Sequence, residues 1–184
     1  MTLLIVGLAL FIGMHLVPSF SMARGGLTAK LGENRYKILF SLASAAGLVL
    51  MVIGYGQAPY SQVFQPSSTV HALLPVGMAV AFVLAAAAYA PGRIRRLVRH
   101  PMMAGVLIWA AMHLLASGDL ASNILFGAFS LWAVFAILSA ERRGKRLGDA
   151  RAGLKADIVA ALVGLIAFAT VLHFHADLFG ATPI

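Results

Sequence analysis

Six apolar runs dominate the sequence, and every Lys and Arg lies between them. Each run is close to the roughly 20 residues that a helix needs to cross a bilayer. Of the 184 residues, 61% are hydrophobic and 11% are charged, whereas a soluble domain is about 45–50% apolar and about 25% charged. The chain is therefore predicted to be an all-α integral membrane protein, a six-transmembrane-helix bundle forming one domain over residues 1–184. The predicted spans are about 2–22, 38–56, 70–90, 101–117, 120–140 and 157–176.

The basic residues occupy only alternate connections between these runs. The second and fourth connections and both ends of the chain carry no Lys or Arg. Short loops rich in Lys and Arg stay in the cytoplasm, which predicts a multi-pass protein of the inner membrane with both termini periplasmic. The three cytoplasmic loops would hold Arg24, Lys30, Arg35 and Lys37; Arg93, Arg95, Arg96 and Arg99; and Arg142, Arg143, Lys145, Arg146, Arg151 and Lys155.

The net charge is +8, and the position of the basic residues beside the membrane indicates what they bind. Basic residues beside a membrane bind anionic lipid headgroups at about 1 kcal/mol each. We therefore expect membrane lipids as partners of the Arg93 to Arg99 cluster, and no nucleic acid.

The two halves of the chain share short phrases. The first and fourth runs both read Gly-x3-aromatic-x2-Met-His-Leu, from Gly7 and from Gly105. The second and fifth both read Ile-Leu-Phe-x3-Ser, from Ile38 and from Ile124. Because each half has three spans, the halves would insert in opposite orientations, which indicates a 3+3 inverted repeat. Coincidence is the alternative, since Leu, Ala and Gly are abundant throughout.

Two of the six histidines lie at matching positions of this repeat. His15 and His113 each follow a glycine by eight residues and an aromatic residue by four, so the three side chains share one helix face. At 1.5 Å per residue each histidine lies about 20 Å from the start of its run, near the midplane. Two histidines can supply both axial nitrogens to a haem iron, and the absence of cysteine excludes thiolate ligands. The pattern predicts haem b, with metal ligands His15 and His113 and a pocket formed by Gly7, Phe11, Gly105 and Trp109.

Other polar residues receive simpler interpretations. Interfacial caps are expected at His71, His173 and His175, although these three could also form an outer metal site or a proton path. Helix N-caps are expected at Asp119 and Asp157. All the histidines could equally form hydrogen bonds between helices, at about 0.6 kcal/mol each, in a cofactor-free accessory or assembly protein. No pair of membrane-buried carboxylates is evident, which argues against a proton-coupled transporter.

Longer phrases carry a resemblance to a known family. They are Gly32-Glu33-Asn34-Arg35-Tyr36-Lys37, Ala90-Pro91-Gly92-Arg93-Ile94, and the stretch from Arg99-His100-Pro101-Met102 through Trp109 and His113 to Gly118-Asp119-Leu120. With these the chain resembles the NnrU family of bacterial membrane proteins over nearly its whole length.

The resemblance implies an association with denitrification, through nitrite and nitric oxide reductases. It also implies kinship with zeta-carotene isomerase, a haem b enzyme that turns a cis double bond trans and has histidine ligands. Those ligands would fall at His15 and His113, with His100 as a third family histidine. Haem and a hydrophobic small molecule or nitric oxide are then the implied partners, and whether this chain is itself an enzyme stays open.

A second resemblance covers one short motif. Arg99-His100-Pro101-x3-Gly105 is similar to a motif of membrane methyltransferases that use S-adenosylmethionine. The motif's tyrosine is missing here, and the paired glutamates of those enzymes reduce to Glu141. A methyltransferase is therefore the lesser alternative.

Overall fold

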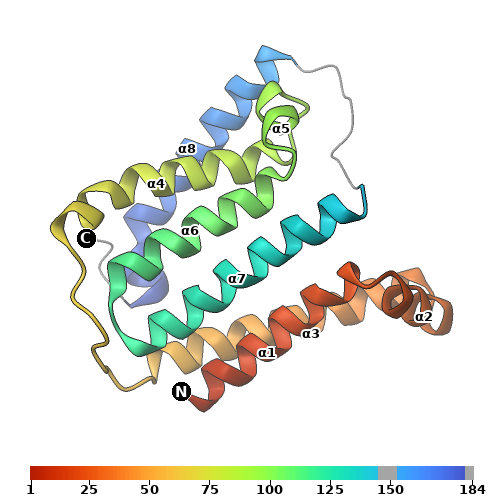
Figure 1. Cartoon of the computed structure of the whole chain (residues 1–184), viewed down its shortest axis with the longest axis horizontal. Coiled ribbons are helices and arrows are strands. Elements are labelled where there is room, and N and C mark those ends of the chain that lie inside the picture. The colour runs from red at the N-terminus through yellow and green to blue at the C-terminus, as the bar shows by residue number, and fades with distance from the viewer. Residues whose placement is uncertain (145–152, 181–184) are drawn as a thin grey trace. The chain divides into compact units, whose positions relative to one another are not determined.

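The structure is a computed structural model that describes residues 1–144 and 153–180, and these residues are almost entirely helical (Figure 1). Their contacts divide the chain into two compact units, unit 1 over Met1–Ser61 and unit 2 over Gln62–Ile184. Each unit is described by itself. Three basic residues assigned to the fifth connection, Lys145, Arg146 and Arg151, lie outside the described residues.

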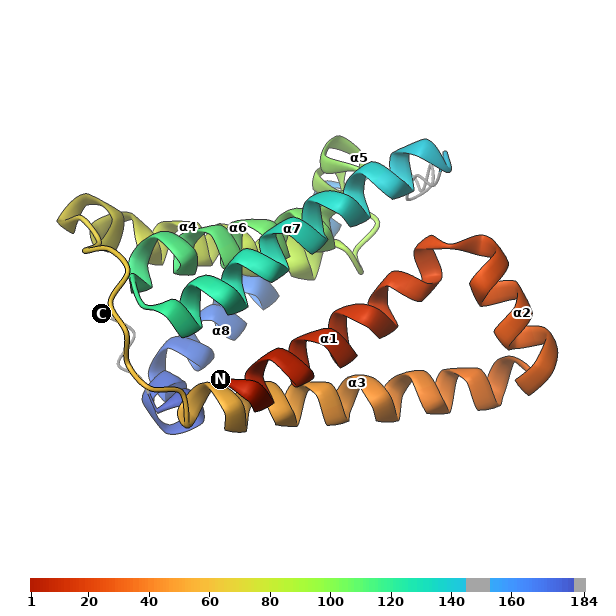
Figure 2. The same ribbon diagram turned by 60° about the horizontal axis from the view of Figure 1, so that its bottom comes forward.

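Unit 1 is a helical hairpin with an extra helix at its turn. It consists of α1 (Thr2–Leu16), the short 3₁₀ helix η1 (Val17–Ser19), α2 (Ser21–Leu31) and α3 (Glu33–Gly56), and α2 connects the two long helices (Figure 2). Glycines let α1 and α3 approach closely, as in many membrane helix pairs. A Cβ atom at Gly7 would lie 2.6 Å from the Met51 nitrogen, and one at Gly47 would lie 2.9 Å from the Phe11 nitrogen.

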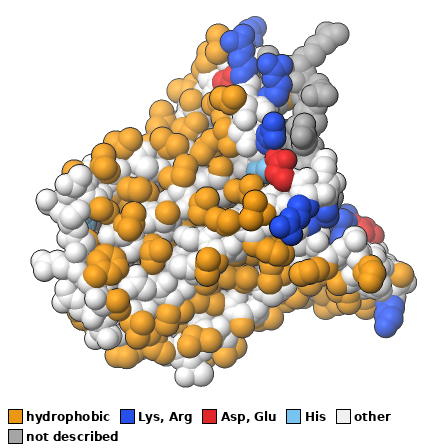
Figure 3. Space-filling view, viewed as in Figure 1, with side chains coloured by type: hydrophobic (Ala, Val, Ile, Leu, Met, Phe, Trp, Pro, Cys, Tyr) orange, Lys and Arg blue, Asp and Glu red, His pale blue; other side chains and the backbone are white. Residues whose placement is uncertain are grey.

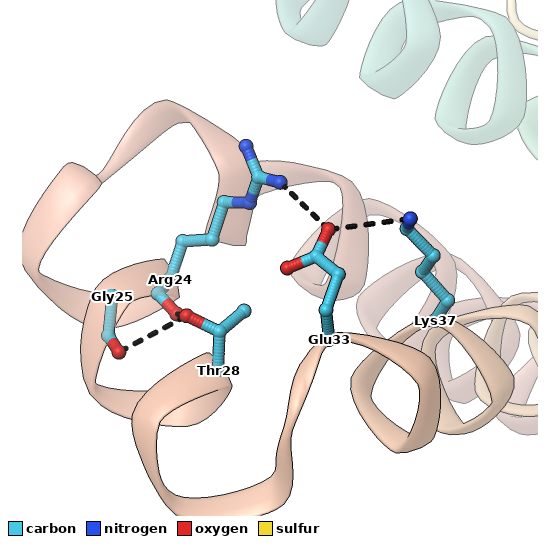
Figure 4. Close-up of polar contacts among 5 residues, drawn as sticks. All are labelled: Arg24, Gly25, Thr28, Glu33 and Lys37. Carbon is cyan, nitrogen blue, oxygen red and sulfur yellow. Dashed lines mark hydrogen bonds and ion pairs between the residues drawn. The ribbon is translucent and has the colours of Figure 1, made fainter.

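Ion pairs tie α2 to the start of α3 (Figure 4). One carboxylate oxygen of Glu33 accepts from Arg24 Nη2 at 3.2 Å and lies 3.4 Å from Lys37 Nζ. Within α2, the Thr28 hydroxyl donates to the Arg24 carbonyl at 3.0 Å. Gly32, with φ 77°, separates the two helices and adopts the left-handed backbone that glycine tolerates. The predicted fold has a connection without a helix here, so α2 is an addition to it.

The described residues of unit 2 form five helices: α4 (Ser68–Ala87), α5 (Arg93–Val98), α6 (Pro101–Ser117), α7 (Leu120–Arg142) and α8 (Leu154–Phe179). α6 packs between α4 and α7, and α8 packs on α4 (Figure 1). Small residues again mark the contacts. A Cβ atom at Gly105 would lie 2.7 Å from the Ala81 oxygen, and one at Gly164 would lie 2.6 Å from the Val83 Cα atom.

Two aspartates cap helices, but only one of them caps its own. The Asp119 carboxylate accepts from Ser122 N at 3.0 Å at the start of α7, as predicted. Asp157 was predicted to cap the sixth span; instead, its carboxylate accepts from Arg93 N and Ile94 N, both at 3.0 Å, at the start of α5. Asp157 lies in the first turn of α8, so the bonds join α8 to α5. That prediction was wrong because α8 begins at Leu154, with Gly153 as its N-cap, so Asp157 lies inside the helix.

The helices have the length and composition of membrane spans. Within residues 1–144 and 153–180, five segments qualify by both criteria: Thr2–Ser19, α3, α4, α7 and α8, while α6, with 17 residues, is a shorter apolar helix. Hydrophobic side chains cover much of the face shown in Figure 3, and Leu131 and Ile166 are 75% and 65% exposed. Outward apolar side chains on long helices suit a lipid environment. The described residues are thus mainly helical, with five or six apolar helices that could span a membrane, as several of the predicted runs require. The first run, predicted over 2–22, is not one helix: α1 ends at Leu16, Phe20 is extended, and α2 begins at Ser21.

Candidate metal-binding histidines

His15 makes a hydrogen bond to its own helix that orients its imidazole ring. Its Nδ1 lies 2.8 Å from the Phe11 carbonyl oxygen. A carbonyl can only accept, so Nδ1 carries the proton and the lone pair of the neutral ring is on Nε2. The Phe11 ring stacks on the imidazole at 4.2 Å between centroids and 23° between planes, and Phe40 of α3 meets it edge-on at 5.1 Å. His15 is therefore held by one carbonyl and two aromatic rings.

His113 in unit 2 has the same surroundings. Its Nδ1 donates to the Trp109 carbonyl oxygen at 2.9 Å. The Trp109 ring lies 5.6 Å from the imidazole between centroids, and Phe126 of α7 lies 4.8 Å from it. The bond to the residue four positions earlier, the ring at that position and the phenylalanine of the next long helix are all reproduced.

The similarity between the two hairpins extends beyond the histidines. Phe40 and Phe126 are the phenylalanines of the shared Ile-Leu-Phe phrase, which sequence reasoning did not connect to the histidines. The serines that close this phrase, Ser44 and Ser130, both have a buried hydroxyl without a hydrogen-bond partner among the described residues. The two hairpins therefore share side-chain contacts as well as amino-acid sequence.

The turn regions match as well. Gly32 and Gly118 have φ values of 77° and 73°, and each is followed by an acidic residue at the start of a long helix. Ile38 follows His15 by 23 positions, whereas Ile124 follows His113 by 11. The 12 extra positions correspond to the 11 residues of α2 and one residue next to that helix. α2 is thus an insertion into an otherwise common hairpin.

His100 belongs to a separate polar cluster. Its Nε2 donates to Glu141 Oε1 at 3.0 Å, and Arg99 Nη1 lies 3.7 Å from the same oxygen. Arg99 has φ 61°, an uncommon value for a residue with a side chain, and Pro101 is fully buried at the start of α6. The cluster joins the beginning of α6 to the end of α7, so His100 has a structural contact rather than a place beside His113.

His175 was predicted to be an interfacial cap, yet it lies beside His113. The two rings, from α8 and α6, are 6.5 Å apart between centroids and 15° from parallel. His173, two positions earlier, is exposed and meets the Phe174 ring. His71 donates from Nδ1 to the Ser67 oxygen at 3.2 Å at the start of α4. No group of three or more His, Asp or Glu side chains in the described ranges could hold a metal ion.

Comparison with known proteins addresses the identity of the chain. The family model described as NnrU protein matches residues 3–183, which include both histidine hairpins. The chain belongs to the NnrU family. Comparisons with curated proteins and with solved structures gave no match. The resemblance inferred from the sequence phrases is thereby confirmed.

Within this NnrU-family chain, Gly7 and Gly105 do not have the position that sequence reasoning gave them. They were expected to admit a macrocycle close to the backbone. Instead, a Cβ atom at Gly7 would meet α3, and one at Gly105 would meet α4, at 2.6–2.7 Å from the nearest backbone atom. Both glycines serve helix packing, and they are left out of the pocket proposed below.

The membrane depth and the pairing of the two histidines remain predictions. His15 is the second-last residue of α1, in the candidate span Thr2–Ser19, and His113 is the fifth-last residue of α6. His15 belongs to unit 1 and His113 to unit 2. Neither unit contains both, and their joint ligation of one iron remains a prediction.

Proposed function

We propose that this NnrU-family chain is a haem b protein of the inner membrane. It would form a single transmembrane domain over residues 1–184 with six spans in a 3+3 inverted repeat. The basic loops would face the cytoplasm, and both termini would face the periplasm. His15 and His113 are the proposed axial ligands of the iron.

The matched state of the two imidazoles carries this proposal. Each donates from Nδ1 to the carbonyl four residues earlier, and such a bond fixes the tautomer and the ring orientation of a ligating histidine. His71 makes a similar bond, so the bond alone does not single out a ligand. The two aromatic contacts that accompany it at His15 and at His113 support the choice of these two histidines.

The two proposed histidine ligands suit a haem iron. Two neutral imidazoles can serve as the axial ligands of a six-coordinate b-type haem. The chain has no cysteine that could supply a thiolate ligand instead. Phe11 and Phe40 beside His15, and Trp109 and Phe126 beside His113, would exclude water and pack against a flat ring. When bound, the haem would supply a redox-active iron.

The family suggests where that iron would be used. NnrU proteins are associated with denitrification, so we propose support of nitrite or nitric oxide reductase, with nitric oxide as a candidate ligand. The kinship with zeta-carotene isomerase makes a redox-dependent polyene cis–trans isomerase the enzymatic version, with a hydrophobic substrate dissolved in the lipid. In both versions the residues of the chain hold the iron and keep water away from it.

A cofactor-free accessory or assembly protein is the second candidate. The hydrogen bonds of His15, His71 and His113 to carbonyls of their own helices favour it, because they satisfy one nitrogen of each ring without a metal. In that case the histidines would stabilise helices only.

An optical spectrum separates these candidates. Protein purified in detergent from haem-replete cells should show a Soret band and sharp reduced α and β bands. Replacing His15 or His113 by Ala should abolish these bands. The matched control, His71→Ala, removes a histidine with the same backbone bond and should leave them intact. A colourless wild-type preparation would favour the cofactor-free protein.

A further inference from the structure

The short helix α5 has one face against unit 2 and one face directed outward. Ile94 and Val98, one turn apart, are partly buried, and the helix contacts α4, α6 and α8. Arg93, Arg96 and Leu97 are exposed, and Leu97 is 84% exposed. Residues three and four positions apart share a helix face, so the outer face of α5 combines two cations with one large apolar side chain.

Asp157 of α8 fixes how α5 presents this face. Its carboxylate accepts from Arg93 N and Ile94 N, both at 3.0 Å. A Cβ atom at Gly92 would collide with that carboxylate, so the contact requires glycine at this position. Because the two N–H groups are already satisfied, the outward side chains form the available surface, and the helix N-terminus does not.

The positive charge of this part of unit 2 is not neutralised by the described residues. Glu141 is engaged by His100 and Arg99, and Asp157 accepts from the backbone of α5. The arginines of α5 form no ion pair with a described carboxylate, and Arg95 Nε is buried without a hydrogen-bond partner in the described ranges. Lys and Arg side chains gather at the end of unit 2 that holds α5 and the start of α8 (Figure 3). An anion from outside these residues would supply the missing negative charge.

We infer that the outer face of α5 binds the headgroup phosphates of anionic phospholipids. Arginine pairs well with phosphate because its planar group offers several N–H donors, and basic residues beside a bilayer attract anionic lipids. The surface consists of Arg93, Arg96 and Leu97. Arg99, which the sequence grouped with these arginines, pairs with Glu141 and is not part of it.

Leu97 favours a lipid over a soluble anion. Helices that lie at a membrane surface direct basic side chains to the headgroups and apolar side chains to the acyl chains. α5 follows α4, which has the length and composition of a membrane span, and precedes the apolar helix α6. A headgroup layer would therefore begin where α5 lies. The inference uses neither proposed histidine ligand and does not depend on haem.

The test uses the full chain in detergent with a fluorescent nitrobenzoxadiazole group attached at Leu97→Cys. This thiol is the only one, because the chain has no cysteine. The probes added are phosphatidylglycerol, phosphatidylcholine and inorganic phosphate. Arg93→Gln/Arg96→Gln removes both cations of the face. The matched control, Lys30→Gln/Arg35→Gln, removes two exposed cations of unit 1, and gel filtration checks that each variant is folded.

Phosphatidylglycerol should change the emission at position 97 until it saturates, whereas phosphatidylcholine and inorganic phosphate should not. Loss of two basic contacts should raise the phosphatidylglycerol concentration at half-saturation about 10–30-fold in Arg93→Gln/Arg96→Gln. The control should match the parent protein. The inference is overturned if the two double variants respond alike, or if phosphatidylcholine or inorganic phosphate produces the same saturating change.

Discussion

Asp157 is the residue through which α8 holds the start of α5. Its carboxylate accepts from Arg93 N and Ile94 N, both at 3.0 Å. Gly92 leaves room for the carboxylate, since a side chain at that position would collide with it. Replacing Asp157 by Ala removes both hydrogen bonds and leaves two N–H groups without their acceptor.

The cost follows from the environment of the two bonds. A hydrogen bond to a charged group contributes about 1.5–3 kcal/mol, and the bond from the exposed Arg93 N–H is counted at a lower value. The expected loss is about 2–4 kcal/mol of unfolding free energy. For a chain of this length, 1 kcal/mol shifts the melting temperature by about 2–4 °C, so Asp157→Ala should melt about 4–16 °C lower.

Thermal unfolding in detergent, followed by circular dichroism, measures this difference. Asp177→Ala is the matched control, because it removes a carboxylate from the exposed end of the same helix. Asp157→Asn keeps one acceptor oxygen and should lie between wild type and Asp157→Ala. If Asp157→Ala and Asp177→Ala melt at the same temperature, the link between α8 and α5 does not stabilise the fold.

Two other predictions concern packing and topology. A leucine at Gly54 would run into the Leu4 backbone, so Gly54→Leu should lose at least about 3 kcal/mol of stability. Gly13→Leu should not, since nothing lies within 4 Å of a Cβ at Gly13; equal melting of the two variants would contradict the close α1–α3 contact. Because the chain has no cysteine, Tyr60→Cys should react with an impermeant maleimide in intact spheroplasts. Met22→Cys should react only after lysis, and the reverse pattern would invert the topology.

The sequence located the helices but not their full lengths. Apolar composition marks the part of a helix that suits lipid, so the second run was predicted from residue 38, whereas α3 begins at Glu33. The polar residues from Glu33 to Lys37 continue the helix beyond the apolar run. α2 escaped notice for a related reason, because Gly25 and Gly26 are poor helix formers and no residue of this helix is buried.

The candidate site was predictable only within single helices. The spacing of Phe11 and His15, and of Trp109 and His113, follows from 3.6 residues per turn. The contacts of Phe40 and Phe126 depend on how a second helix packs, and the approach of His175 depends on the register of α8 in unit 2. A single sequence does not show which residues of α8 lie beside which residues of the neighbouring helices. The glycines were misread for the same reason, since a partner helix and a ligand both favour a small residue.

The proposed function depends on histidine ligation of a haem iron in this NnrU-family chain. Low-temperature electron paramagnetic resonance of the oxidised protein, purified from haem-replete cells, measures this ligation. We expect one haem per chain with the low-spin ferric signal of two imidazole ligands. Protein without haem, or with haem that is high-spin in the ferric state, would contradict it.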